Sequence, residues 1–235
     1  MATEYGNKGI VTSGLTLCLD AGNLKSYPTS GTTWTNLTRS GNNGTLVNFQ
    51  SQTPFSNVGG GSIVFDGTDN TVSIPSTLGG LTSLTILTWV YMTAYNPNGP
   101  AVFIWPISDN SAVSPFTIIS LGTTTSGVLN GSIGNGSTRT IFTSEQSITL
   151  NRWHQVGFWW NGSIVKTTLN GVVSSTQTSA VYILGNSSAK IYLGAYNTNN
   201  SYWLQGYISN TLFYNRALSA SEVLQNYNAT KYRFQ

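Results

Sequence analysis

Short segments in which apolar residues alternate with polar or small ones recur along the chain. Leu15–Asp20 (LTLCLD) places a leucine at every second position, and Ser83–Ala94 (SLTILTWVYMTA) is longer and rich in β-branched and aromatic residues. A period of two is typical of strands that have one buried face and one solvated face. Further segments of this kind are SIVFDG, TVSIP, AVFIWPIS, PFTIISLG, GVLNGSIG, TRTIFTS, RWHQVGFWWNG, IVKTTLNGV, KIYLGAY and WLQGYISNTLFYN.

The residues between these segments predict tight connections. Asn-Gly pairs begin at Asn130, Asn161 and Asn170, each beside a strand-like run. Asn-Gly adopts the positive φ angles of two-residue hairpins at low cost. The turn-rich DGTDN joins SIVFDG to TVSIP and predicts another hairpin-like connection. Antiparallel strands without helical spacers predict an all-β sandwich of two sheets.

A helix start signal lies near the C-terminus. Ser219 and Glu222 form an S-x-x-E capping box, in which the serine accepts from the N3 amide and the glutamate bonds back to the N-cap. The apolar residues that follow share one helical face: Val223, Leu224 and Tyr227. We expect a helix at about 219–229, too short to be stable alone, that docks on the sandwich.

The pattern indicates a single domain. No internal repeat or linker interrupts residues 15–235. Residues 1–14 precede the first strand, and we expect them to form an N-terminal arm that is ordered against a neighbouring subunit. The C-terminal residues KYRFQ are expected to be free to dock on neighbours as well. Exposed strand edges favour a symmetric homo-oligomer.

The composition is that of a surface protein with few charges. Charged residues make up 7% of the 235 residues, and the net charge is +3 without a cluster of Lys or Arg. Nucleic-acid binding needs such clusters, so no nucleic-acid partner is expected. No signal peptide and no apolar stretch of membrane-spanning length is visible, so we expect no membrane insertion. An exposed surface of Asn, Ser and Thr without an export signal favours a virion component assembled in a host cytoplasm.

Three blocks carry a family resemblance: SIVFDGTDNTVSIP, LNRWHQVGFWWNGSIVKTTLNGV and LQGYISNTLFYNRALSASEVLQNYNAT. From about Gly14 to Thr230 the chain resembles a concanavalin A-like, laminin-G-like jelly roll, and the last block is similar to the closing strand and helix of that family. The opening GLTLCLDAGNLKSYPTSG resembles a leader of this domain in tailed-phage structural proteins. The resemblance implies two packed antiparallel sheets and a virion setting. Fold alone does not fix a ligand.

Glycoside hydrolysis is a candidate activity, because glucanases share the fold that the resemblance implies. Retaining glycosidases need two carboxyl groups about 5 Å apart, and the resemblance implies an E-x-D-x-x-E strand for them. The chain has seven acidic residues and no such pattern: Glu4, Asp20, Asp66, Asp69, Asp109, Glu145 and Glu222. We therefore expect no catalytic residues and no enzyme.

The single histidine and the single cysteine also favour structural roles. His154 follows Trp153 in a strand, without a Gly-x-Ser-x-Gly elbow, so we expect it to donate to a neighbouring backbone group. Cys18 lies on an alternating strand, where a buried, inert thiol is the usual state. Neither a disulfide nor a typical zinc site can be assembled from these residues.

Calcium is the metal that the resemblance raises. Ca²⁺ takes six to eight oxygen ligands, and Asp66, Asp69 and Asn70 lie in one turn. An Asx-rich turn explains the same residues, and we prefer that interpretation. Relatives carry G-x-I-D in the closing strand, whereas this chain has Ser209 at the acidic position, followed by Asn210. No cofactor is expected to be required, and a weak calcium site is the open alternative.

A glycan site needs an aromatic surface and a few amides or hydroxyls. We expect it on two loops, at the following residues: Tyr196, Asn197, Asn199, Tyr202, Trp203, Trp105 and Asp109. Packing of each ring into the core or its rim is the alternative, and it is preferred for Trp160, whose strand sends Val156 and Phe158 to the same face.

These features give three hypotheses for function. The first is a virion structural protein, a capsid decoration or tail-associated adhesion module, with other virion proteins as partners and host-surface glycans as ligands. The second is a free carbohydrate-binding lectin. The third and least favoured is a polysaccharide-degrading glycoside hydrolase.

Overall fold

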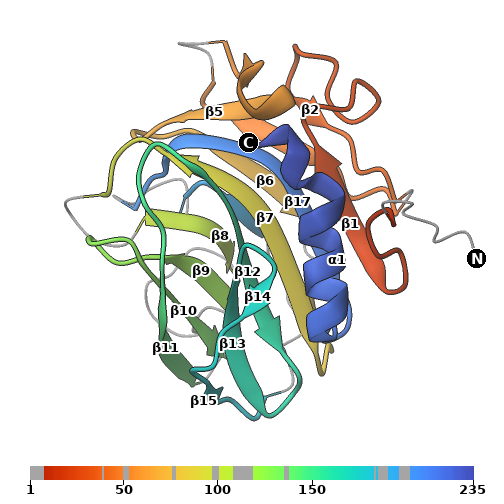
Figure 1. Ribbon diagram of the computed structural model, residues 1–235. Helices are drawn as coiled ribbons and strands as arrows, with labels where there is room; N and C mark the ends of the chain where they lie inside the picture. The colour runs from red at the N-terminus through yellow and green to blue at the C-terminus, as the bar shows by residue number, and fades with distance from the viewer. Residues whose placement is uncertain are drawn as a thin grey trace, which may run out of the picture.

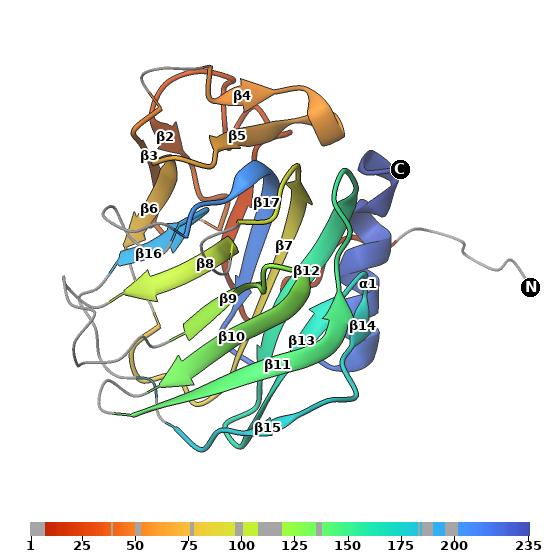
Figure 2. The ribbon, with the colours of Figure 1, turned by 90° about the vertical axis from the view of Figure 1, so that its left-hand side faces the viewer.

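The computed structural model describes residues 8–38, 40–49, 53–75, 78–96, 101–107 (backbone only), 119–134, 138–182, 184, 190–195 and 202–235. In these residues the chain forms a nine-stranded and an eight-stranded antiparallel sheet. Figure 2 shows the two sheets packed against each other, with the helix on the far side of the nine-stranded sheet. The predicted all-β sandwich of two antiparallel sheets is therefore confirmed.

The nine-stranded sheet carries the helix (Figure 1). Its strands are β1 (Leu15–Asp20), β4 (Phe55–Ser56), β5 (Ser62–Asp66), β7 (Leu84–Met92), β12 (Trp153–Trp160), β13 (Ile164–Leu169), β14 (Val172–Val173), β15 (Thr178–Ser179) and β17 (Gln205–Tyr214). The central order is β12-β7-β17-β5. We call the side turned away from the other sheet its outer face.

The eight-stranded sheet closes the sandwich on the opposite side. Its strands are β2 (Thr33–Trp34), β3 (Gly44–Val47), β6 (Thr71–Pro75), β8 (Ala101–Ile107), β9 (Ile119–Thr123), β10 (Val128–Gly134), β11 (Arg139–Ser147) and β16 (Lys190–Leu193). The order is β11-β10-β9-β8-β16-β6-β3-β2.

The main core lies between the sheets, as strand alternation predicts. On β12 the side chains of Val156, Phe158 and Trp160 all point inward and are fully buried. The Trp160 indole also donates to the Ala180 carbonyl at 2.8 Å, so its polar atom is satisfied. The prediction that Trp160 is a core residue is confirmed. Burial of side chains of this size contributes about 1.5–3 kcal/mol each.

Two predicted turns are wrong. Asn130 and Gly131 lie inside β10, where the glycine leaves room for the Ser120 carbonyl of the neighbouring strand β9. The DGTDN segment is a corner, and not a hairpin, since β5 belongs to one sheet and β6 to the other. The turns that begin at Asn161 and Asn170 join β12 to β13 and β13 to β14, as predicted. Asn170 and Gly171 have the positive φ angles of a two-residue hairpin, whereas Asn161 opens a longer turn, in which its side chain accepts from the Ser163 and Ile164 amides.

The predicted helix is α1 (Ala220–Thr230), and Ser219 is its N-cap. Both halves of the capping box form, because the Ser219 hydroxyl accepts from the Glu222 amide and the Glu222 carboxylate accepts from the Ser219 amide. Val223 is fully buried against the outer face, as predicted, whereas Leu224 is 45% exposed. Leu224 therefore lies beyond the helical stripe that contacts the sheet.

A second apolar cluster lies between α1 and the outer face. Its members are Val11, Cys18, Leu87, Leu212, Tyr214, Leu218 and Val223. Cys18 is buried as predicted, and burial raises the pKa of its thiol to about 11. The thiol is therefore protonated and inert at neutral pH.

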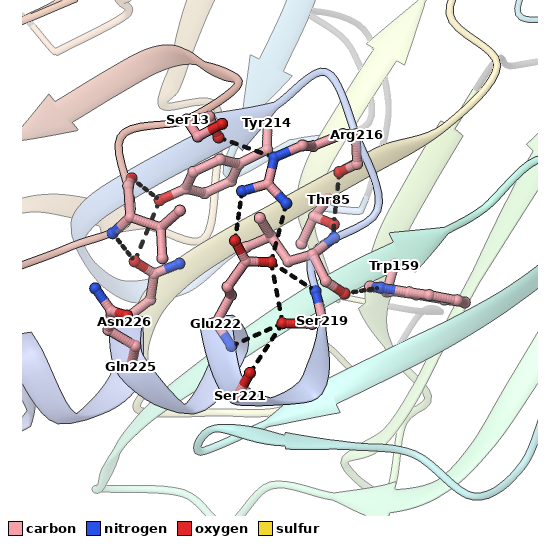
Figure 3. Close-up of polar contacts among 12 residues, drawn as sticks. Ser13, Thr85, Trp159, Tyr214, Arg216, Ser219, Ser221, Glu222, Gln225 and Asn226 are labelled. Carbon is pink, nitrogen blue, oxygen red and sulfur yellow. Dashed lines mark hydrogen bonds and ion pairs between the residues drawn. The ribbon is translucent and has the colours of Figure 1, made fainter.

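The N-terminal segment lies against α1 of its own chain (Figure 3). The Val11 amide donates to Asn226 Oδ1 at 2.8 Å, and the Tyr214 hydroxyl donates to the Val11 carbonyl at 2.9 Å. Arg216 Nε donates to the Ser13 carbonyl at 3.0 Å. This part of the predicted arm at 1–14 is therefore tied to its own domain and not free for a neighbouring subunit.

The C-terminal residues are docked on the domain as well. Phe234 follows a 3-10 turn at Lys231–Arg233 and stacks on Trp89 with ring centroids 4.1 Å apart. Arg233 forms an ion pair with Asp20 at 2.9 Å. The expectation that KYRFQ is free to dock on neighbours is wrong, because its aromatic ring and its arginine are used within the chain.

Candidate functional site

The loop residues predicted for a glycan site fall into separate places. Outside the described residues lie Tyr196, Asn197, Asn199 and Asp109. Trp105 lies on β8, in register with Tyr192 of β16. Tyr202 and Trp203 are half-buried in the segment before β17, where the Trp203 carbonyl accepts from Asn96 Nδ2 at 3.4 Å. As ligand contacts, all of these residues stay predictions.

The predicted calcium residues form the corner between the sheets. Asp66 Oδ1 accepts from the amides of Thr68 (2.8 Å) and Asp69 (3.3 Å), which is an Asx turn. The buried amide of Asn70 accepts from the Asp66 amide at 3.1 Å and donates to the Asn48 carbonyl at 2.7 Å. These bonds explain how the chain leaves one sheet for the other. Calcium binding by Asp66, Asp69 and Asn70 stays a prediction.

A row of aromatic side chains crosses the outer face where α1 ends. Tyr207 of β17 is in register with Tyr91 of β7, and Tyr91 is in register with Trp153 of β12. Successive strands lie about 4.8 Å apart, so residues in register on one face are in direct contact. We call Tyr91, Trp153 and Tyr207 the aromatic platform.

The rings of the platform form one compact cluster. The ring centroid of Tyr91 lies 5.6 Å from that of Trp153 and 5.6 Å from that of Tyr207, and both pairs are edge-to-face. The centroids of Trp153 and Tyr207 are 6.4 Å apart, with tilted planes. Edge-to-face pairs at these distances are favourable beyond the area they bury. All three residues are half-buried, so part of each is exposed to solvent.

A polar row lies beside the platform on the same face. Gln205 of β17 is in register with Asp66 of β5, two residues along the strands from Tyr207. The Gln205 carbonyl accepts from the Thr93 amide at 3.0 Å, which places Thr93 beside it. Gln205 and Thr93 are exposed and Asp66 is half-buried. An amide, a hydroxyl and a carboxylate therefore lie next to the rings and supply donors and acceptors for hydroxyl groups.

Trp153 is supported from two sides. A Cβ atom added to Gly59 would lie 2.5 Å from Cζ2 of Trp153, so the backbone of η1 (Val58–Gly60) contacts the indole directly. Phe234 lies 4.9 Å from Trp153 and also stacks on Trp89, which is buried beneath α1. A glycine is required at the point of contact because no side chain fits there.

Three of the described carboxylates are held by structural partners: those of Asp20, Glu145 and Glu222. Asp20 pairs with Arg233, and Glu222 pairs with Arg216 while capping α1. Glu145 accepts from the Ser174 hydroxyl at 2.6 Å, and this bond together with others from the same loop holds the pKa of its carboxyl well below its usual range. Among the described residues, no group of three or more His, Cys, Asp or Glu side chains is placed to hold a metal ion.

His154 lies at the edge of the core and is half-buried. Its Nε2 accepts from the Thr149 amide at 3.3 Å, so the ring contacts the neighbouring backbone as an acceptor and not as the donor that we expected. Burial lowers the pKa of the imidazole, which favours the neutral ring.

The sequence did not lead us to predict the aromatic platform, although strand alternation already places one of its residues, Trp153, on a solvated face. Inward positions on β12 are Val156, Phe158 and Trp160, so Trp153 falls on the opposite, wet face. A tryptophan on the wet face of a strand calls for an explanation. The registers that bring Tyr91 and Tyr207 beside it join residues far apart in the sequence, and local patterns do not contain them.

Two packed antiparallel sheets with one helix on the outer face define a β-sandwich domain, and its outer face carries the aromatic platform and the adjacent polar row. The chain belongs to the concanavalin A-like lectin/glucanases superfamily, whose family model matches residues 66–224. No curated protein sequence matches the chain. Among the described residues, no helix has the length and apolar character needed to cross a membrane.

Solved structures share the fold at low sequence identity. Trypanosoma rangeli sialidase in complex with the inhibitor DANA has a TM-score of 0.68 at 12% identity, over 96% of this chain and 34% of the sialidase chain. Domain 4 of AbnA, a GH43 extracellular arabinanase from Geobacillus stearothermophilus, in complex with arabinotriose, has a TM-score of 0.67 at 17% identity, over 91% of this chain and 98% of that chain. The receptor binding domain of botulinum neurotoxin type G has a TM-score of 0.63 at 15% identity, over 92% and 51%. This chain therefore spans about a third of the sialidase chain that it matches.

The comparisons contradict the expectation that this chain is not an enzyme. The family includes glucanases, and the structures of similar fold include a sialidase and a domain of an arabinanase. That expectation rested on a missing E-x-D-x-x-E strand, which is one catalytic arrangement among several. Sialidases, for example, use a tyrosine nucleophile, so a count of carboxylates does not exclude glycosidase chemistry.

Proposed function

We propose that this chain is a carbohydrate-binding domain that holds a saccharide on the outer face of the nine-stranded sheet. The observation that carries the proposal is the aromatic platform of Tyr91, Trp153 and Tyr207, whose rings cluster within 6.4 Å on a wet face. Aromatic rings offer large apolar area at low entropy cost and suit the C–H surface of a sugar. Asp66, Thr93 and Gln205 would bond the hydroxyl groups at the sugar's edge.

The family and the fold support this proposal. The superfamily to which the chain belongs is described by its lectins as well as by its glucanases. The arabinanase domain, which this chain covers almost completely, was solved with arabinotriose. The proposal for this chain rests on the platform, since the identity to that domain is 17%.

A glycan array compares the platform with the loop site predicted from the sequence. We expect the wild-type chain to bind a subset of neutral saccharides, and Trp153→Ala to weaken the Kd about tenfold or more, as the loss of a central aromatic contact does. Tyr232→Ala is the matched control, because Tyr232 is 65% exposed on the nearby C-terminal segment and lies outside the platform. Loss of binding in Trp203→Ala with full binding in Trp153→Ala would move the site to the segment before β17. Silence across the array would refute carbohydrate binding.

We also propose a setting for this domain, an adhesion module on a virus particle that contacts host-surface glycans as a homo-oligomer. The support is the resemblance of the opening stretch to leaders in tailed-phage structural proteins. Mass spectrometry of purified particles tests this setting. We expect the chain among the particle proteins, and its consistent absence would overturn the proposal.

A further inference from the structure

Arg233 connects the C-terminus to segments that are distant in the sequence. Its Nη1 donates to both carboxylate oxygens of Asp20, at 2.9 Å each. Its Nη2 donates to the Ser209 hydroxyl at 3.0 Å and to the Gly60 carbonyl at 3.4 Å. The guanidinium group therefore joins the end of β1, the η1 segment and β17. We call this set of bonds the C-terminal clamp.

The segments in the clamp are also bonded to one another. The Ser209 hydroxyl donates to the Gly61 carbonyl at 2.6 Å, and the Ser209 carbonyl accepts from the Ala21 amide at 2.9 Å. Ser209 is fully buried. The planar guanidinium holds the carboxylate through Nη1 and the Ser209 and Gly60 oxygens through Nη2, so its bonds fix direction as well as distance. The clamp therefore fixes how η1 and the C-terminus lie on the outer face.

The two supports of Trp153 are the immediate neighbours of residues in the clamp. Gly59, whose backbone contacts the indole, precedes Gly60, which accepts from Arg233. Phe234, 4.9 Å from the same indole, follows Arg233 itself. Both supports of the indole therefore lie one residue away from a bond of the clamp.

We propose that Arg233 is a positioning residue for the aromatic platform, so that saccharide affinity depends on an ion pair outside the platform. This proposal rests on the proposed carbohydrate binding. Arg233 acts through Gly59 and Phe234, which hold the Trp153 ring in its place beside Tyr91 and Tyr207. The C-terminal five residues are then part of the binding device and not merely the end of the fold.

The test compares Arg233→Gln with Arg216→Gln. Arg216 is the matched control, because it pairs with Glu222 at 2.6 Å, its side chain is 30% exposed against 28% for Arg233, and it lies at the other end of α1. Two quantities are measured. One is the Kd for the saccharide with the strongest array signal, with arabinotriose titrated in parallel. The other is the ¹H–¹⁵N resonance of the Trp153 indole, assigned from its loss in Trp153→Phe.

We expect Arg233→Gln to shift the Trp153 indole resonance and to weaken the Kd about three- to tenfold, which is a usual size for coupling through packed neighbours. We expect Arg216→Gln to lower the melting temperature to a similar degree and to change neither quantity. An unchanged indole resonance in Arg233→Gln, or an equal shift in Arg216→Gln, would overturn the proposal. Free guanidinium at millimolar concentration should restore the resonance in Arg233→Ala, and failure to do so also counts against a role of the charge in positioning.

Gly59→Ala provides a route to the same ring if the Arg233 variants do not fold. Its new Cβ would lie 2.5 Å from Cζ2 of Trp153, so the ring must shift, while the side chains of Arg233 and Asp20 are unchanged. We expect a shifted indole resonance and a weaker Kd, and an unchanged Kd despite a shifted resonance would contradict the link between ring position and affinity. If no saccharide binds, carbohydrate binding fails as a function, while the indole resonance alone still decides whether Arg233 positions Trp153.

Discussion

An ion pair lies at each end of α1, and the two differ in reach rather than in chemistry. Arg216 and Glu222 are six residues apart and meet beside the N-cap. Arg233 and Asp20 are 213 residues apart and join the two ends of the domain. Side-chain exposure is similar, at 30% and 29% for the first pair and 28% and 23% for the second.

This difference separates local stability from the shape of a site. Part-exposed ion pairs contribute about 1 kcal/mol or less, so neither pair is required for folding. The Arg216–Glu222 pair adds to a capping box that the local sequence already specifies. The Arg233–Asp20 pair fixes η1 and the C-terminus, which support Trp153. Two ion pairs of similar energy therefore have different roles: Arg216–Glu222 stabilises the start of α1, and Arg233–Asp20 fixes the segments that support the aromatic platform.

The largest effect on stability is expected between the two pairs, at Asn226. Its Oδ1 accepts from the Val11 amide at 2.8 Å and from the Tyr214 hydroxyl at 3.2 Å, and the residue is fully buried. Asn226→Ala leaves the buried Val11 amide without its acceptor, whereas the Tyr214 hydroxyl keeps its bond to the Val11 carbonyl. An unsatisfied buried group costs about 1–3 kcal/mol, so we expect the free energy of unfolding, from urea titration, to fall by about 1–3 kcal/mol.

Gln225→Ala is the matched control for Asn226→Ala. Gln225 donates to the Gly9 carbonyl at 2.8 Å, from the same helix to the same N-terminal segment, but at an exposed position. Its loss should cost less than about 1 kcal/mol, because water replaces the bond. Equal losses in the two variants would mean that Asn226 acts only by holding the N-terminal segment, and not through buried polar groups.

The sequence predicted those parts of the fold that depend on neighbours in the chain. The capping box at Ser219 and Glu222 and the turns at Asn161 and Asn170 are set by a few consecutive residues. The burial of Trp160 follows from strand alternation, which is also local. The resemblance supplied the pairing of these elements into a sandwich.

The parts that were predicted wrongly or missed depend on contacts between distant segments. The sequence after Asp66 predicts a hairpin, but the chain turns a corner there, and Asn70 bonds the Asn48 carbonyl, 22 residues away in the sequence. The aromatic platform needs the register of three strands, and the docking of Phe234 needs the finished sheet. Tyr202 and Trp203 were predicted as ligand contacts because they follow a polar loop, whereas the aromatic platform forms on the face of a sheet. Alternation would have placed Trp153 on that face, but only the registers supply its partners.

The smallest effect that we predict is a dependence of stability on acid at the Glu222 end of α1. Hydrogen bonds from Arg216, and then from the Ser219 amide, lower the pKa of the Glu222 carboxyl from 4.5 to about 2. Between these two values the unfolded chain binds a proton that the folded chain does not. The contribution of Glu222 is therefore present above pH 4.5 and is lost as pH falls toward 2. Because the side chain is 29% exposed, screening by water limits it to about 1 kcal/mol or less.

Glu222→Gln tests this share of the acid sensitivity, because glutamine keeps the capping acceptor and removes the charge. Urea unfolding at pH 6 should show the wild type more stable by up to about 1 kcal/mol, and the difference should shrink to nothing near pH 2. Glu145, whose pKa is also lowered, makes both proteins less stable in acid and cancels from the difference. If the difference in unfolding free energy between the wild type and Glu222→Gln does not change from pH 6 to pH 2, the carboxylate contributes only as a cap. The Arg216–Glu222 pair would then be dispensable, and the contrast with the Arg233–Asp20 pair, whose charge we expect to position a ring, would become sharper.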